Sequence, residues 1–116
     1  MKDTTMRTLN HVGIPTTIKQ PNENYSPDMK LFLTDFNSSP NKIEFLRFEP
    51  ESTMPEILKT HAHLAYQVDN LKAAMEGKEI LLEPFKAGPG LTCCFIIEEG
   101  IAIELMEFEA PGNVMY

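Results

Sequence analysis

Short apolar runs, some of them with partial alternation of apolar and polar residues, recur along the chain, and they predict strands more often than helices. The runs, in chain order, are 9–14, 29–36, 42–48, 63–68, 79–82, 91–98 and 101–108. One helix of about two turns is expected after residue 69, with Asp69 as its N-cap and Gly77 at its end. We expect Pro84 to end the strand at 79–82, because proline cannot donate to a strand ladder.

The two halves of this pattern are alike except in one segment. The second half is predicted as strand, helix, strand, strand, strand. The first half is predicted as strand, long loop, strand, strand, because residues 16–28 are polar and contain Pro21 and Pro27. The first half should therefore lack its helix and one edge strand.

An internal repeat supports this division. Residues 42–49 (KIEFLRFE) align with residues 102–109 (AIELMEFE), and residues 9–14 (LNHVGI) align with residues 61–66 (HAHLAY). The aligned histidines are 52 residues apart and the aligned glutamates are 60 apart, and the difference matches the shortened first half. Such self-similarity indicates two equivalent modules.

Each repeat places a glutamate in the middle of a strand. Glu44 shares a strand face with Leu46 and Phe48, and Glu104 has equivalent apolar neighbours in its own strand. Burying a carboxylate among apolar side chains is costly unless a cation or strong donors compensate. Either glutamate alone is better explained as a surface residue on the solvent face. Two equivalent glutamates, each preceded by a strand histidine, favour one shared site.

The chain has three histidines, His11, His61 and His63. His11 and His63 align, whereas His61 has the same strand parity as His63 and stays open as an alternative ligand or a supporting group. Two imidazoles and two carboxylates suit Zn, Ni, Co, Mn or Fe(II), with positions left for water or substrate. The residues therefore predict one divalent-metal site made by His11, Glu44, His63 and Glu104.

Composition and charge narrow the classes of function. The 116 residues fit one domain, 1–116. The formal net charge is −7 and no lysines or arginines cluster, which argues against a nucleic-acid partner and against an anionic membrane surface. No segment approaches the roughly 18 apolar residues of a spanning helix.

The compartment is predicted from the cysteines and the N-terminus. Cys93 and Cys94 are adjacent on a strand, which provides no disulfide framework, and the N-terminal residues contain no secretory apolar run. We expect a cytoplasmic location, buried and inert thiols, and a loosely attached tail at 110–116.

Four segments, LNHVGI, KIEFLRF, HLAYQVDNLKAAMEG and GIAIELMEF, resemble the landmark segments of the glyoxalase/bleomycin-resistance/dioxygenase group, the vicinal oxygen chelate superfamily. The resemblance is strongest over residues 63–108. It implies an α+β fold in which tandem βαβββ modules, about 7–50 and 60–109, form a curved mixed sheet or half-barrel around a metal site. The first module would lack most of its helix. The family's ligands come from the first and last strands of each module, which implies His11, Glu44, His63 and Glu104 here.

The resemblance also implies a function. We expect a divalent-metal-dependent isomerase or lyase of glyoxalase or epimerase type, acting on a small oxygen-chelating substrate, with Glu104 or Glu44 moving the proton. The alternatives are a non-catalytic small-molecule binding protein on the same fold and an Fe(II) ring-cleaving dioxygenase. Lys19, Lys30 and Lys86 are scattered, so no basic cluster is available for glutathione or coenzyme A anions. The open edges of such modules favour a homodimer.

Overall fold

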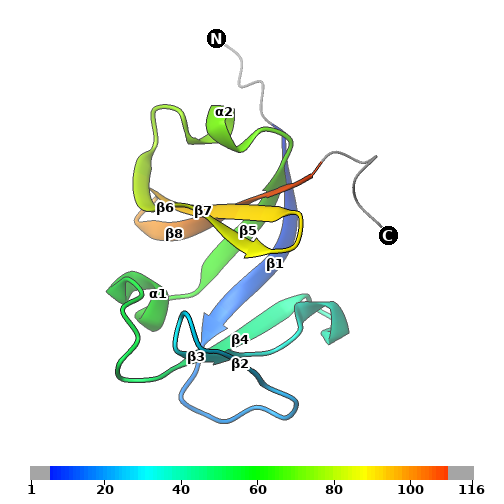
Figure 1. Ribbon diagram of the computed structural model, residues 1–116, viewed down its shortest axis with the longest axis vertical. Coiled ribbons are helices and arrows are strands. Elements are labelled where there is room, and N and C mark those ends of the chain that lie inside the picture. The colour runs from blue at the N-terminus through cyan, green and yellow to red at the C-terminus, as the bar shows by residue number, and fades with distance from the viewer. Residues whose placement is uncertain (1–5, 110–116) are drawn as a thin grey trace.

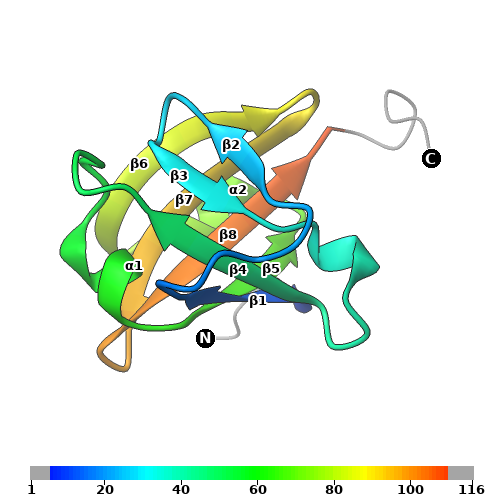
Figure 2. The same ribbon diagram turned by 90° about the horizontal axis from the view of Figure 1, so that it is seen from below.

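The strands form one curved, mixed sheet. In the computed structural model, which describes residues 6–109, eight strands follow the order β2-β3-β4-β1-β5-β8-β7-β6. The strands are β1 (Arg7–Pro15), β2 (Asn24–Ser26), β3 (Leu31–Leu33), β4 (Ile43–Phe48), β5 (His63–Val68), β6 (Glu79–Gly88), β7 (Leu91–Glu98) and β8 (Ile101–Phe108). The sheet curls into a half-barrel, as Figures 1 and 2 show from two directions, and this confirms the predicted fold class. The predicted tail at 110–116 lies outside the described residues.

The two halves arrange their strands in the same order outward from the centre of the sheet. In the first half, β1 pairs in parallel with β4, and in the second half β5 pairs in parallel with β8. The outer strands of each half are antiparallel. An antiparallel pairing of β1 with β5 joins the halves. The first and last strands of both halves therefore lie together at the centre of the sheet.

The helices are few and short: η1 (Phe36–Ser38), α1 (Glu56–Thr60) and α2 (Leu71–Met75). In Figure 1, α2 lies above the strands of the second half. Within the described residues no helix forms between β1 and β2, as predicted for the shortened half. No helix between residues 6 and 109 has the length and apolar character needed to cross a membrane.

The predicted cap of α2 is wrong by one residue. The helix begins at Leu71, and the Asn70 side chain accepts a hydrogen bond from the Ala73 backbone N–H at 3.0 Å. Asn70 is therefore the N-cap in place of Asp69, because only a side chain directly before the first helical residue reaches that N–H. Gly77 follows the helix with φ +74°, a left-handed conformation that favours glycine.

Two edge strands also differ from the prediction. Residues 24–26, expected to be loop, form the short strand β2 on the edge of the first half. At the other edge, β6 continues through Pro84 to Gly88. The register of β6 against β7 shifts between Leu82 and Phe85, so the missing N–H of the proline interrupts no regular ladder. An edge strand tolerates a short length, as in β2, or a proline, as in β6, because one of its sides has no neighbouring strand.

The second half has a core on each face of its sheet. The outer face packs under α2, where Cys94 is buried with Ile96 and Leu105. On the inner face Cys93 is buried with Ala65 and Met106. Burial raises the pKa of Cys94 to about 11 and raises the pKa of Cys93 further, with the Glu104 carboxylate adding to the effect. Both thiols are therefore protonated near neutral pH, which makes them poor nucleophiles.

Candidate metal centre

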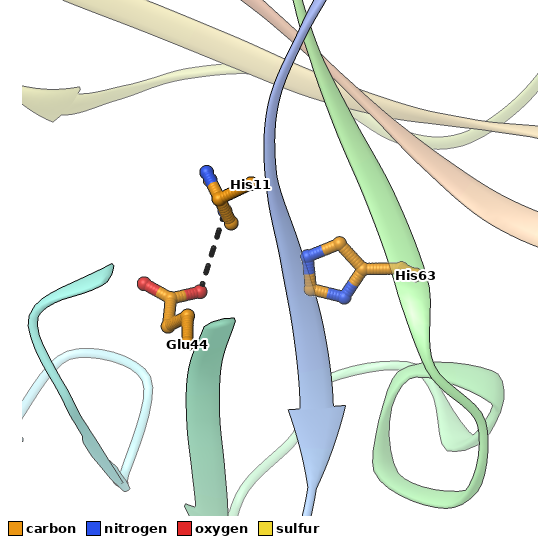
Figure 3. A group of neighbouring side chains, drawn as sticks. All are labelled: His11, Glu44 and His63. Atoms are coloured by element: carbon orange, nitrogen blue, oxygen red, sulfur yellow. Dashed lines mark ion pairs between the residues drawn. The ribbon is translucent and has the colours of Figure 1, made fainter. Parts of the chain in front are cut away.

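Four side chains meet on the inner face of the sheet, two from each half. One donor atom each of His11, Glu44 and His63 lies within 4.8 Å of the others. Figure 3 shows these three side chains projecting toward one another from β1, β4 and β5. His11 Nε2 lies 3.5 Å from Glu44 Oε1. Glu104 Oε1 approaches from β8, 3.6 Å from His11 Nε2 and 3.2 Å from His63 Nε2.

The two halves present these residues in the same register. In the first half Gly13, two residues after His11, pairs with Glu44 on the parallel strand. In the second half Ala65, two residues after His63, pairs with Glu104. This register brings each histidine and its glutamate to the inner face at matching positions.

His11 is held by Asn10 and Phe36. The His11 side chain is 2% exposed, and its ring stacks on Phe36 with centroids 4.0 Å apart. His11 Nδ1 lies 2.8 Å from Asn10 Oδ1. An amide oxygen only accepts, so Nδ1 carries a proton, and Nε2 faces the centre as the atom that could bind an ion once it has lost its own proton. Within the described residues Nε2 is buried without a hydrogen-bond partner.

Asn10 was not among the predicted site residues. Neighbouring residues of a regular strand point to opposite faces, so Asn10 and His11 should diverge. The β1–β5 register shifts between Leu9 and His11, and both Asn10 and His11 line the same cavity. The bulge arises from the pairing of β1 with β5, so the sequence around Asn10 contained no signal for it.

His63 lies over the backbone of Gly13. Residues 13 and 63 are direct partners in the β1–β5 pairing, and the imidazole covers the glycine. A Cβ on residue 13 would lie 2.6 Å from His63 Nε2 and 2.7 Å from Nδ1, which is closer than van der Waals contact allows. Phe95 packs edge-on against the ring with centroids 5.3 Å apart. Glycine at position 13 is thus what allows His63 to reach the centre.

The carboxylates and imidazoles polarise one another. Burial lowers the pKa of His11, but the adjacent carboxylates of Glu104 and Glu44 outweigh it and raise that pKa to about 9. Burial raises the pKa of Glu104, and the two histidines outweigh it, lowering that pKa to about 2. The centre therefore binds positive charge strongly, here as a proton.

The donor set fits a divalent metal ion. Ligand atoms about 2.1 Å from a tetrahedral ion lie roughly 3.4 Å apart, close to the spacings that His11 makes with the two glutamates. The buried, unpartnered Nε2 of His11 is a further indication, because buried polar atoms normally have partners. His11, Glu44 and His63 could hold an ion, with Glu104 adjacent to both histidines.

His61 lies away from this group. It is exposed at the end of α1, and its Nδ1 lies 2.8 Å from Thr60 Oγ1. Of the two open candidates, the structure therefore brings His63 to the centre and leaves His61 on the surface.

The four side chains form part of the wall of a cavity of about 390 Å³. Both halves of the sheet contribute strands to it, and Phe36 and Asn37 of η1 contribute the rim. Leu46, Phe48, Met106 and Phe108 line it, as the strand parity predicts. The centre thus lines a partly open, mainly apolar cavity.

No protein-family model and no curated protein sequence matches the chain. Solved structures do match its fold. The hypothetical protein BH1468 from Bacillus halodurans C-125 has a TM-score of 0.67 and 18% identity, over 93% of this chain and 99% of that one. Methylmalonyl-CoA epimerase from Mycobacterium tuberculosis has a TM-score of 0.61 and 22% identity, over 97% of this chain and 95% of that one. The likeness extends over nearly all of each chain, and it shows that the curved βαβββ-type fold is shared.

Proposed function

We propose that this protein is a divalent-metal-dependent isomerase or lyase of glyoxalase or epimerase type, acting on a small substrate with two adjacent oxygens. The observation that carries the proposal is the convergence of two histidines and two glutamates, in matching registers of the two halves, on the wall of a mainly apolar cavity. The shared fold with an epimerase supports the same class of reaction.

The proposed ligands are His11, Glu44, His63 and Glu104. Asn10 keeps the His11 proton on Nδ1, which leaves Nε2 free to bind the ion. A bound divalent ion would supply electrophilic stabilisation of negative charge on the substrate oxygens. The identity of the ion is open among Zn, Ni, Co, Mn and Fe(II).

One of the two glutamates moves the proton in this proposal. A carboxylate oxygen of Glu44 or Glu104 accepts a proton from the carbon next to the substrate carbonyl. In an isomerisation the same carboxyl then returns the proton to the adjacent carbon, whereas inversion at one carbon would need the other glutamate, in its protonated form, to donate a proton from the opposite side. The reaction is a proton relocation, so no oxidant or reductant is required. Apolar walls support it, because they exclude water from the exchanging proton.

Metal analysis tests the site, and glutamine variants separate its roles. We expect purified protein to contain about one divalent ion per chain. Of Glu44→Gln and Glu104→Gln, the variant that removes a ligand should lose metal. The glutamate that moves the proton is the ligand that loosens from the ion during the reaction, so its variant should keep most of the metal but stop deuterium exchange into a hydroxyketone such as 2-hydroxyacetophenone. If both variants leave metal content and exchange unchanged, the site assignment is wrong.

A binding protein on the same fold is the second candidate. Apart from the four proposed ligands, only Asn10 and Asn37 among the described lining residues are polar, so few groups are present to handle a substrate. Metal content distinguishes the metal-dependent enzyme from the binding protein. Protein that contains no ion, and gains no thermal stability from any of the five, would favour a binder.

A further inference from the structure

The walls of the cavity are apolar from the centre outward. Beyond the four proposed ligands, its described lining is aliphatic, aromatic or thioether except for Asn10 and Asn37. Asn10 is already bonded to His11, and Asn37 accepts a bond from the exposed Lys42 at 3.4 Å. A ligand in this space would therefore find apolar contact on most sides and few further hydrogen-bond partners.

The described lining of the cavity contains no cation that could pair with an acidic substrate. Among the described residues, no lysine or arginine lines the cavity. Arg47 lies on the opposite face of β4 from Glu44 and is paired with Glu23 at 2.7 Å. The Lys59 ammonium donates to the Ser52 carbonyl. A carboxylate or phosphate placed beside the centre would be buried without a partner, which is costly.

The net charge of the metal-loaded centre also disfavours an acidic substrate. Two neutral imidazoles, two carboxylates and one divalent ion sum to zero. The ion's charge is therefore balanced by the protein, and none is left over to attract an anionic group elsewhere on the substrate.

A second apolar hollow lies beside the first. It measures about 480 Å³, and Met29, Met54 and Phe85 line both. Leu81 and Leu82 of β6 continue its wall, and its single described charged residue is Glu83. Methionine side chains adapt to ligands of different shape, so this hollow suits a flexible or variable apolar group. An acidic group there would meet the like charge of Glu83.

We infer that the substrate is uncharged apart from its two chelating oxygens, with an aryl or alkyl body that extends from the centre toward Met29 and Met54. This inference rests on the proposed function, since it takes the chelating end to be held by the metal. It predicts weak binding of substrates that place a carboxylate or phosphate inside the cavity.

Three hydroxamic acids test the inference on metal-loaded protein. Acetohydroxamic, benzohydroxamic and 4-carboxybenzohydroxamic acid present the same two adjacent oxygens and differ only in the body. By isothermal titration calorimetry we expect benzohydroxamic acid to bind at least tenfold more tightly than either of the others. Equal or tighter binding of the carboxylated compound, or of the acetyl compound, would overturn the inference.

A variant at the junction of the two hollows sharpens the test. Met54→Lys places a cation there, and the preference against the carboxylated compound should fall about tenfold. Met54→Leu should keep the wild-type order, and so should Met6→Lys, since Met6 is 76% exposed. If Met54→Lys does not fold by circular dichroism, the wild-type ranking alone decides.

If the proposed function is wrong, the binding experiment gives a different result. In that case the protein takes up no ion and binds no hydroxamic acid, and the inference falls with it. A fully loaded protein with the wrong ranking would overturn the inference and leave the metal site intact.

Discussion

Each histidine of the candidate site depends on one residue of β1. Asn10 sets the tautomer of His11, and Gly13 leaves the space that His63 occupies. Neither residue has a donor atom in the group of His11, Glu44 and His63. At the scale of the residue, the geometry of the donors is therefore determined by neighbours that do not bind the ion themselves.

Replacing Asn10 with alanine should weaken metal binding about 10- to 100-fold, because His11 loses the acceptor that fixes its proton. Affinity is measured by titration calorimetry with the ion identified by metal analysis. Asn10→Asp keeps an acceptor and should lose less. Asn37→Ala, which lines the same cavity without contacting His11, is the control. Equal affinity of Asn10→Ala and wild type would contradict the role of Asn10.

Replacing Gly13 with alanine should displace the His63 ring, because the new methyl group overlaps it. We expect at least a tenfold loss of metal affinity and lower thermal stability of the metal-free protein. Gly88→Ala is the matched control, since a Cβ there meets nothing within 4 Å. If Gly13→Ala binds metal as tightly as Gly88→Ala, the imidazole is not held as the structure places it.

At the scale of elements, the strands that are buried on one or both faces were predictable and the edges were not. Residues 43–48, 63–68, 91–98 and 101–108 form strands as predicted, because their apolar residues are buried on the curved sheet. The strand β2 is three residues long and mostly exposed, so it contains no such alternation. The prediction that Pro84 ends a strand was wrong because β6 lies at the edge of the sheet, where one side of the strand makes no hydrogen bonds to a neighbouring strand. The bulge at Asn10 arises from pairing with β5, which local sequence does not specify.

An ion pair links the start of β1 to the end of β7. Arg7 binds Glu98 through two hydrogen bonds of 2.8 and 3.0 Å, and Lys78 approaches the same carboxylate at 2.7 Å. These cations lower the pKa of Glu98 from its usual 4.5 to about 2. The pair holds the first strand of one half against the hairpin of the other.

The stability contributed by Glu98 should therefore be fully present above pH 4.5 and be lost as the pH falls toward 2, since the folded state binds the proton less tightly than the unfolded state. We expect on the order of 1 kcal/mol, because solvent screens this partly exposed pair. Urea unfolding at pH 6 and pH 3 measures it. Glu98→Gln should flatten this dependence, whereas Glu99→Gln in the adjoining turn should leave it unchanged. Identical pH dependence of all three proteins would exclude the effect.

At the scale of the whole molecule, an ion at the centre would join the two halves. The donors come from β1 and β4 on one side and from β5 and β8 on the other, and the unfolded chain brings them together only by chance. Binding of an ion to the folded state alone raises stability by mass action, by about 2.7 kcal/mol at 100 times its dissociation constant.

Loading the protein with its ion at that excess should raise the midpoint of thermal unfolding by about 10 °C, taking roughly 4 °C per kcal/mol for a domain of this size. Differential scanning calorimetry measures the shift, and a chelator should reverse it. His11→Ala should show little shift under the same conditions. A shift of similar size in His11→Ala would place the ion elsewhere.

The antiparallel pairing of β1 with β5 has a kinetic consequence. His11 and His63 are both buried, and they lie on the two strands of this pair. An ion held between them cannot leave through the motion of one side chain. Ligands on both strands must release it together, because a single released ligand can bind again before the others let go. We therefore expect the ion to exchange slowly compared with the motion of any one side chain, and its exchange rate would report how firmly the two strands hold their ligands in place.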